Sequence, residues 1–225
     1  MIPLYTFFGM KRSGQHAIIN WICKQHGGGI TYKNNCNLQG HGRGTVALYK
    51  EGGAFGAWNF EDPDIAKIIQ VMGSNRFHGA IPILIIRDPY NWIASCMHRL
   101  VTSDSKIEHD VALKLPKRIE TYKEHIKQTI DDLMVISFNK WFSDSQYREG
   151  ICAALEIPFT DEGKHEVTRY GDGSSFDQRK YDGNAQQMQV LQRWEQYVNN
   201  KKYLEYIDDE LKEIAKTAFN IGPLT

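Results

Sequence analysis

The chain lacks long hydrophobic runs. No stretch of its 225 residues reaches the ~18 consecutive apolar residues that a membrane-spanning helix needs. The apolar start of the chain, up to Phe8, is short, and no basic region precedes it. We therefore expect neither a signal peptide nor a membrane anchor.

Cysteine is scarce as well. The four cysteines are Cys23, Cys36, Cys96 and Cys152, and no two of them form a C-x-x-C pair. This spacing argues against a disulfide framework and against a zinc site. Three of the four fall in predicted helices, where cysteine is usually a small buried hydrophobe. The pattern indicates a reduced, cytoplasmic protein without a metal.

An excess of charge of one sign is also missing, because 27 Lys and Arg balance 27 Asp and Glu. A general nucleic-acid binder usually carries a strong basic excess, so we expect no nucleic-acid partner. The balanced total still allows a local basic pocket for a small anion. With 41% hydrophobic residues, the length fits a single domain, 1–225, around one core.

Strand and helix patterns alternate along the chain. Helical periodicity, apolar runs and Gly or Pro breaks define the elements. The predicted strands are 4–8, 45–50, 54–60, 81–86 and 133–138, and the predicted helices are 15–25, 63–72, 89–100, 142–155, 188–198 and 204–218. A helical stripe follows an interruption at Pro116, and 160–184 is a polar loop. This alternation predicts an α/β three-layer sandwich with a mainly parallel central sheet.

A glycine-containing loop joins the first predicted strand to the first predicted helix. Gly9 and Gly14 allow backbone amides to approach a phosphate, and the helix presents its positive end to it. Side chains that can contact the phosphate are those of Lys11, Arg12, Ser13, Gln15 and His16. The GxxxxGK[ST] loop of Mg-nucleotide enzymes needs a lysine where Gln15 stands. The loop is therefore P-loop-like, and a simple strand-to-helix turn is the alternative.

A second motif begins where the strand 81–86 ends. Arg87 follows this buried-type strand, at the edge where open α/β sheets bind ligands, and Ser95 comes eight residues later on the next predicted helix. An arginine and a hydroxyl placed in this way can bind one phosphate together. The alternative is an Arg87 paired with Asp88 and a Ser95 that is only buried.

Together the two motifs resemble the family of sulfotransferases that use 3′-phosphoadenosine-5′-phosphosulfate (PAPS). Its first signature, Pro-Lys-Ser-Gly-Thr-Thr after a strand, matches the position of Lys11 to His16, although Arg12, Gln15 and His16 depart from the common residues. Its second, a strand-end Arg with Asp-Pro and a Ser eight residues on, matches Arg87 to Ser95. The resemblance implies that the loop holds the 5′-phosphosulfate and that Arg87 and Ser95 hold the 3′-phosphate. It also implies that Arg12 or Lys11 stabilises the bridging oxygen, without a metal.

Two further parts of the site follow from this resemblance. Family members close the 3′-phosphate site with a late loop, and the residues here that fit it are Ser174, Ser175, Arg179 and Lys180. A polar surface loop is the alternative for this segment. The family places a general base, His or Glu, at the end of the strand before the arginine, where Glu61 stands. Burial beside Trp58 and Phe60 would raise its pKa. The rivals for this role are Asp62, Glu51, His41 and His78, and a helix cap is the alternative role for Glu61 or Asp62.

The sequence thus predicts an enzyme that transfers a sulfuryl group from PAPS to a hydroxyl or amine by in-line displacement. The acceptor is a small molecule or a carbohydrate, and the product nucleotide is adenosine 3′,5′-bisphosphate (PAP). Two alternatives stay open: a P-loop nucleotide kinase or NTPase, and a non-catalytic nucleotide-binding protein. The sequence indicates neither the identity of the acceptor nor the oligomeric state.

Overall fold

The computed structural model describes residues 4–27, 29–38, 41, 43–48, 54–102, 105–167, 174 and 176–224. The chain divides into two compact units, Met1–Ile86 with Gln128–Lys164 and Arg87–Lys127 with His165–Thr225. Each unit is described by itself. A single domain over the whole chain stays a prediction.

The first unit holds a sheet in the order β3-β2-β4-β1-β5-β6. Its strands are β1 (Leu4–Gly9), β2 (Gly29–Asn34), β3 (Arg43–Leu48), β4 (Ala54–Glu61), β5 (Ile81–Ile86) and β6 (Met134–Ser137). Five of them run parallel, and β3 pairs antiparallel with β2 at the edge. The predicted mainly parallel α/β sheet is confirmed, and β2 is a strand that the sequence patterns missed.

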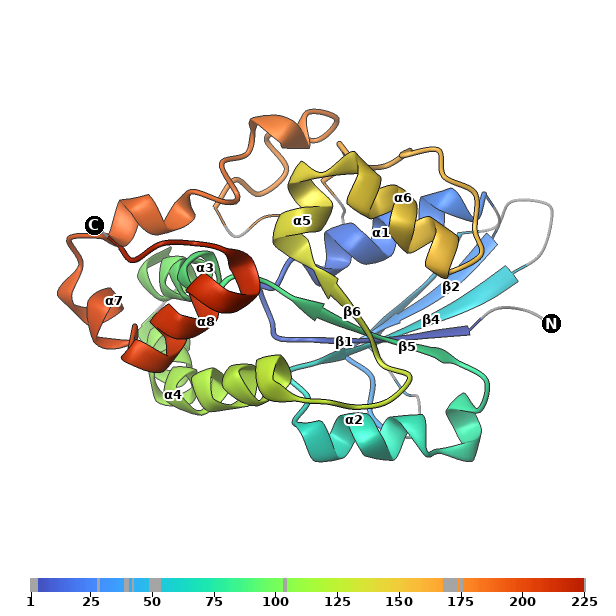
Figure 1. The fold of residues 1–225 in the computed structure, drawn as a ribbon, viewed down its shortest axis with the longest axis horizontal. Helices are drawn as coiled ribbons and strands as arrows, with labels where there is room; N and C mark the ends of the chain where they lie inside the picture. Colours follow the sequence, from blue (N-terminus) through green and yellow to red (C-terminus); the bar gives the residue numbers. More distant parts are fainter. Residues whose placement is uncertain are drawn as a thin grey trace. The chain divides into compact units, whose positions relative to one another are not determined.

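Helices cover both faces of this sheet (Figure 1). The helices α1 (Gln15–Gln25), α5 (Phe138–Ser143) and α6 (Ser145–Ala154) lie on one face, and α2 (Ile65–Met72) lies on the other. The core under α2 joins Phe8, Phe60 and Leu84 of the central strands to Ile68 and Val71 of the helix, all fully buried. Burial of apolar area on both sheet faces is what stabilises such a unit.

Two helix starts differ from the sequence-based expectation. The predicted helix 63–72 begins at Ile65, and its cap is Asp64, whose carboxylate accepts from the Lys67 amide at 2.8 Å. Asp62 is therefore not the cap. The predicted helix 142–155 is two helices, because Asp144 ends α5 and caps α6 by accepting from the amides of Gln146 and Tyr147.

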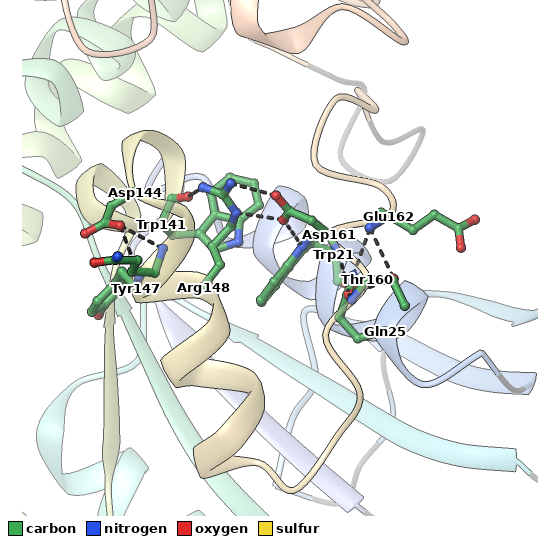
Figure 2. A network of polar contacts seen from close by, with 10 residues as sticks. Trp21, Gln25, Trp141, Asp144, Tyr147, Arg148, Thr160, Asp161 and Glu162 are labelled. Atoms are coloured by element: carbon green, nitrogen blue, oxygen red, sulfur yellow. Dashed lines mark hydrogen bonds and ion pairs between the residues drawn. The ribbon is translucent and has the colours of Figure 1, made fainter.

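A polar network ties the segment after α6 to α1 (Figure 2). Nε and Nη2 of the Arg148 guanidinium each donate to one oxygen of Asp161 at 2.7 Å, and the Trp21 indole donates to the same carboxylate at 3.0 Å. Gln25 accepts from the backbone and the hydroxyl of Thr160. Arg148 is buried, so Asp161 neutralises a charge that would otherwise be costly inside the unit.

The second unit is mostly helical. It contains α3 (Pro89–Thr102), α4 (Ser105–Lys127), α7 (Lys201–Glu205) and α8 (Asp209–Phe219), with short 3-10 turns at Ala185–Gln187 and Arg193–Tyr197. Asp88 caps α3 by accepting from the Asn91 amide at 2.8 Å, as the Asp-Pro pair predicts. Three expectations are wrong: α4 continues through Pro116, 188–198 contains a 3-10 turn at Arg193–Tyr197 in place of a helix, and 204–218 is divided between α7 and α8.

Within the described parts of the chain, no helix combines the length and apolar character needed to cross a membrane. The four cysteines are buried free thiols.

Candidate functional site

The β1–α1 loop has an unusual backbone. Arg12 has a φ of 74° and Gly14 a φ of 85°, so two residues of the loop occupy the left-handed region. For a non-glycine residue this conformation is uncommon, and successive backbone amides in such a turn can form a concave site for an anion. Gly14 also lies against the Phe138 ring, which a Cβ at this position would meet at 2.3 Å. The loop therefore needs glycine at position 14 for both its φ and its packing.

Ser13 lies inside this loop with its hydroxyl unsatisfied. The residue is 2% exposed, and its Oγ has no hydrogen-bond partner among the residues that the structure describes. A buried hydroxyl without a partner costs about 1–3 kcal/mol unless a ligand or water accepts its proton. Its position before the first turn of α1 fits an oxygen of a phosphate or sulfate. The residues present thus fit the anionic group that the sequence predicts here.

Asp62 holds the loop from the end of β4. Its carboxylate accepts from the Lys11 amide at 2.7 Å, and its own amide donates to the Gly9 carbonyl at 3.0 Å. The residue has a φ of 51°, which turns the chain sharply after β4. Asp62 is thus a structural partner of the loop rather than a free proton acceptor or a helix cap.

Glu61 ends β4 beside the same loop. Its Oε1 accepts from His16 Nε2 at 3.2 Å and from Gln15 Nε2 at 3.4 Å, and its Oε2 lies 3.6 Å from Lys11 Nζ. Burial acts to raise the pKa of Glu61, but the hydrogen bond and charge of His16 and the charge of Lys11 outweigh it and leave the pKa below its usual range. The expected rise of this pKa is wrong, because the sequence did not show that two basic side chains face the carboxylate.

Two further rivals of Glu61 for the role of base, His41 and His78, are among the described residues. Both are exposed. Glu51 lies outside the described residues. Glu61 is therefore the acid that the structure brings to the loop together with Lys11, Gln15 and His16.

In the second unit, Arg87 and Ser95 meet as the sequence predicts. Arg87 donates to Ser95 Oγ at 3.2 Å, and it also donates to the Val190 carbonyl. Tyr122 donates to the Arg87 carbonyl at 2.7 Å and fixes the backbone there. Burial lowers the pKa of Arg87 to about 10, with the nearby charge of Asp88 acting in the opposite direction. An arginine in this state stays charged at neutral pH and strongly favours an anion beside it.

The late loop is organised by a residue that the sequence patterns did not single out. Arg193 is 6% exposed, and its guanidinium donates to Ser174 Oγ at 2.6 Å and to Asp177 at 3.1 Å. Arg193 also stacks over the Phe176 ring at 4.6 Å. The two predicted phosphate ligands of this loop, Arg179 and Lys180, are exposed, with Arg179 paired to Asp182 and Lys180 lying over Tyr181.

Ser175, the remaining predicted residue of the late loop, lies outside the described residues. Sequence reasoning also missed Tyr32 and Asn91. The Tyr32 hydroxyl shares a hydrogen bond with His16 Nδ1. The Asn91 side chain donates to the Leu191 carbonyl and accepts from the Arg193 amide. No local signal marks these residues, because their partners are distant in the chain. Across the described residues, no cluster of His, Cys, Asp or Glu could hold a metal ion.

Comparisons with known proteins give the fold a context. No protein-family model matches the chain, and no curated protein matches it. The structure is similar to the crystal structure of mouse sulfotransferase SULT7A1 complexed with PAP, with a TM-score of 0.53 and 12% sequence identity. The match covers 96% of this chain and 86% of that chain. At this identity the likeness shows the fold alone, an α/β sulfotransferase fold with a P-loop-like first loop.

Proposed function

We propose that the protein is a sulfotransferase that uses PAPS. The observation that carries the proposal is the contact between Arg87 and Ser95, two buried residues that meet at 3.2 Å. The 3′-phosphate is what distinguishes PAPS from the donors of ordinary P-loop enzymes, and an arginine with a hydroxyl is a fitting pair of donors for it. The fold that the chain shares with a PAP-bound sulfotransferase supports the same assignment.

Each predicted side chain then has a role. Arg87 and Ser95 bind the 3′-phosphate, and Lys180 and Arg179 are further candidates for it. Gly9 to Gln15 bind the phosphosulfate end, with the Ser13 hydroxyl donating to an oxygen. Lys11 and Arg12 stabilise the negative charge that develops on the leaving oxygen. PAPS supplies an activated sulfuryl group for attack by the acceptor.

Glu61 is the proposed proton acceptor for the substrate hydroxyl or amine. Its carboxylate lies at the end of β4, next to Lys11. The pKa of this carboxyl is below its usual range, so Glu61 is ionised at neutral pH but is a weaker base than a carboxylate with a raised pKa. We propose a small-molecule or carbohydrate acceptor. The four buried free thiols support a reducing compartment, and we propose the cytoplasm.

A thermal-shift series tests the nucleotide assignment. PAP is expected to raise the melting temperature far more than AMP or ATP, because only PAP has the 3′-phosphate. A ligand at ~100 times its Kd adds about 2.7 kcal/mol to stability. Ser95→Ala removes the hydroxyl that accepts from Arg87 and donates to the Asn91 carbonyl at 2.8 Å, and it should reduce the PAP shift while leaving the AMP shift as it is. Equal shifts with PAP and AMP in the wild type would contradict the assignment of Arg87 and Ser95.

Transfer itself is tested with labelled PAPS and a panel of alcohols, phenols, amines and sugars. Glu61→Gln should retain PAP binding and lose transfer by ~100-fold or more. Binding of PAP without transfer to any member of the panel would favour a non-catalytic nucleotide-binding protein. A requirement for magnesium together with ATP turnover would favour the kinase class.

A further inference from the structure

His16 lies between two polar side chains of the first unit. Its Nε2 is 3.2 Å from Glu61 Oε1, and its Nδ1 is 2.9 Å from the Tyr32 hydroxyl. His16 belongs to the first turn of α1, Tyr32 to β2 and Glu61 to the end of β4. The His16 side chain is 19% exposed and that of Glu61 is 11% exposed. The three residues thus form a short, half-buried chain that begins at the phosphate-binding loop.

The Tyr32 hydroxyl has further partners besides His16. It lies 3.2 Å from Asn34 Oδ1, and Asn34 Oδ1 also accepts from Asn59 Nδ2 at 2.7 Å. The same hydroxyl shares a hydrogen bond with His16 Nδ1 at 2.9 Å. The ionised carboxylate of Glu61 only accepts, so His16 Nε2 donates to it. With Nδ1 bonded to Tyr32 and Nε2 bonded to Glu61, neither ring nitrogen of His16 is left for an oxygen of a phosphate.

The two oxygens of Glu61 have different surroundings. Oε1 receives the donors His16 and Gln15, and Gln15 is 2% exposed. Oε2 lies 3.6 Å from Lys11 Nζ, and the Lys11 side chain is 40% exposed. A long, exposed lysine side chain exchanges partners easily, whereas a ring held on both sides does not. The geometry holds Oε1 in place and leaves Oε2 for an exchangeable partner.

We propose that His16 is a positioning residue for Glu61, held in turn by Tyr32, and not a ligand of the phosphosulfate. This inference rests on the proposed sulfotransferase function. Glu61 Oε2 takes the proton of the acceptor hydroxyl while the acceptor oxygen bonds to sulfur. The bond between sulfur and the bridging oxygen breaks, and its electron pair leaves with PAP. His16 keeps the carboxylate aligned during this step and afterwards stays bonded to Oε1.

Carbon-13 NMR of the glutamate carboxyl groups tests the inference without any nucleotide. The Glu61 signal is assigned by its absence in Glu61→Gln, and its titration is followed in each variant. The charged and titratable groups that face this carboxyl are Lys11, His16 and Tyr32. His16→Gln should raise the pKa of Glu61, because the charge of His16, which lowers that pKa, is removed. Tyr32→Phe should raise it less, since His16 Nε2 is retained.

The chain contains a matched control for this experiment. Tyr5 and His26 form another tyrosine–histidine pair in the same unit, with the Tyr5 hydroxyl 2.8 Å from His26 Nε2. Tyr5→Phe should leave the titration of Glu61 as in the wild type. A Glu61 titration that stays unchanged in His16→Gln would overturn the inference. Tyr32→Phe is a conservative change that keeps the test readable if His16→Gln fails to fold.

Calorimetry with PAP separates this inference from the proposed function. Ser13→Ala should weaken PAP binding by about tenfold, since a buried donor is lost. His16→Gln should weaken it clearly less than Ser13→Ala does. A loss in His16→Gln as large as that in Ser13→Ala would show that the ring binds phosphate, and would overturn the inference. A wild type that binds no PAP contradicts the proposed function, and the Glu61 titration still decides the role of His16.

Discussion

Gly14 has a backbone φ of 85° at the start of α1, and a Cβ added there would lie 2.3 Å from the Phe138 ring. Alanine in the left-handed region costs roughly 1–2 kcal/mol. Forcing the methyl against a packed ring adds about 1–3 kcal/mol. We expect Gly14→Ala to lower the free energy of unfolding by about 2–5 kcal/mol, measured by urea denaturation, and to weaken PAP binding.

Gly27 provides the control for Gly14. It has a φ of 64°, but a Cβ there meets no atom of the described residues within 4 Å. Gly27→Ala should therefore show the backbone cost alone, roughly 1–2 kcal/mol. Replacing Phe138 by alanine in the Gly14→Ala background should recover part of the loss. Equal costs at positions 14 and 27 would mean that the Phe138 contact does not constrain the loop.

At the scale of the element, local patterns predicted most of the sheet. The run 81–86 matches β5, and the Gly-containing turn followed by helical periodicity matches α1 from Gln15 to Gln25. These elements were predictable because their signals are short in range: an apolar run, a glycine turn, an Asp-Pro cap. β2 was missed because its residues are largely polar and it is defined by pairing with β4, far along the chain.

The segment 188–198 shows why a helical stripe can mislead. Its apolar residues recur every three or four positions, yet its backbone bonds go elsewhere. Asn91 of α3 accepts from the Arg193 amide at 2.8 Å and donates to the Leu191 carbonyl at 2.9 Å. These bonds take backbone groups that a continuous helix would use. α4 shows the opposite case, because Leu115 and Ile119 are buried on either side of Pro116 and the helix continues.

Part of the candidate site was also predictable from the sequence. The loop from Gly9 to His16, the strand-end Glu61 and the pair Arg87 and Ser95 all follow from motif spacing. The contacts that tune them do not, since Tyr32 at His16 and Arg193 at Ser174 join segments that are far apart in sequence. A single sequence shows which side chains end a strand, but not which side chains from other elements meet them.

For the molecule as a whole, acid should remove part of its stability through Asp161. Burial acts to raise the pKa of Asp161, but the hydrogen bonds and charge of Arg148 and the bond from Trp21 outweigh it and hold the pKa below its usual range. A carboxyl with a lowered pKa stabilises the fold above its unfolded pKa, and this contribution is lost as pH falls through the folded value. We expect Asp161→Asn to be less stable than the wild type by about 2 kcal/mol near neutral pH.

The difference between Asp161→Asn and the wild type should shrink as the pH falls below about 4, where aspartate in the unfolded chain takes up a proton, and should be lost once the pH is below the lowered pKa of the folded protein. Urea denaturation at a series of pH values measures it. Asp209→Asn is the control, because Asp209 pairs with Lys212 on the surface, with side chains 97% and 49% exposed. Such an exposed pair contributes little. A constant difference at every pH would show that the charge of Asp161 is not what stabilises the network in Figure 2.

High pH should change the stability of the first unit through Lys164. Lys164 is 5% exposed, and its ammonium lies over the rings of Phe142 at 4.1 Å and Trp141 at 5.1 Å. Burial, helped by the charge of Arg148, lowers the pKa of Lys164 to about 8. Between about pH 8 and pH 10.5 the unfolded chain therefore binds a proton that the folded protein has released, so stability contributed by this group rises with pH.

Lys164→Met replaces the buried ammonium by an apolar chain of similar length. Near pH 7 the variant should be more stable than the wild type by about 1–2 kcal/mol, once solvent screening and the lost cation–π contacts are allowed for. Near pH 10 most of this advantage should vanish, because the wild-type lysine is then neutral in the fold. The buried thiols, whose pKa burial raises, titrate alike in both proteins and cancel in the difference.

Lys140→Met is the matched control, since Lys140 is exposed and lies 5.9 Å from the Tyr147 ring, and it should show no such pH dependence. An advantage of Lys164→Met that is equal at both pH values would trace the effect to packing and contradict a buried charge at this position.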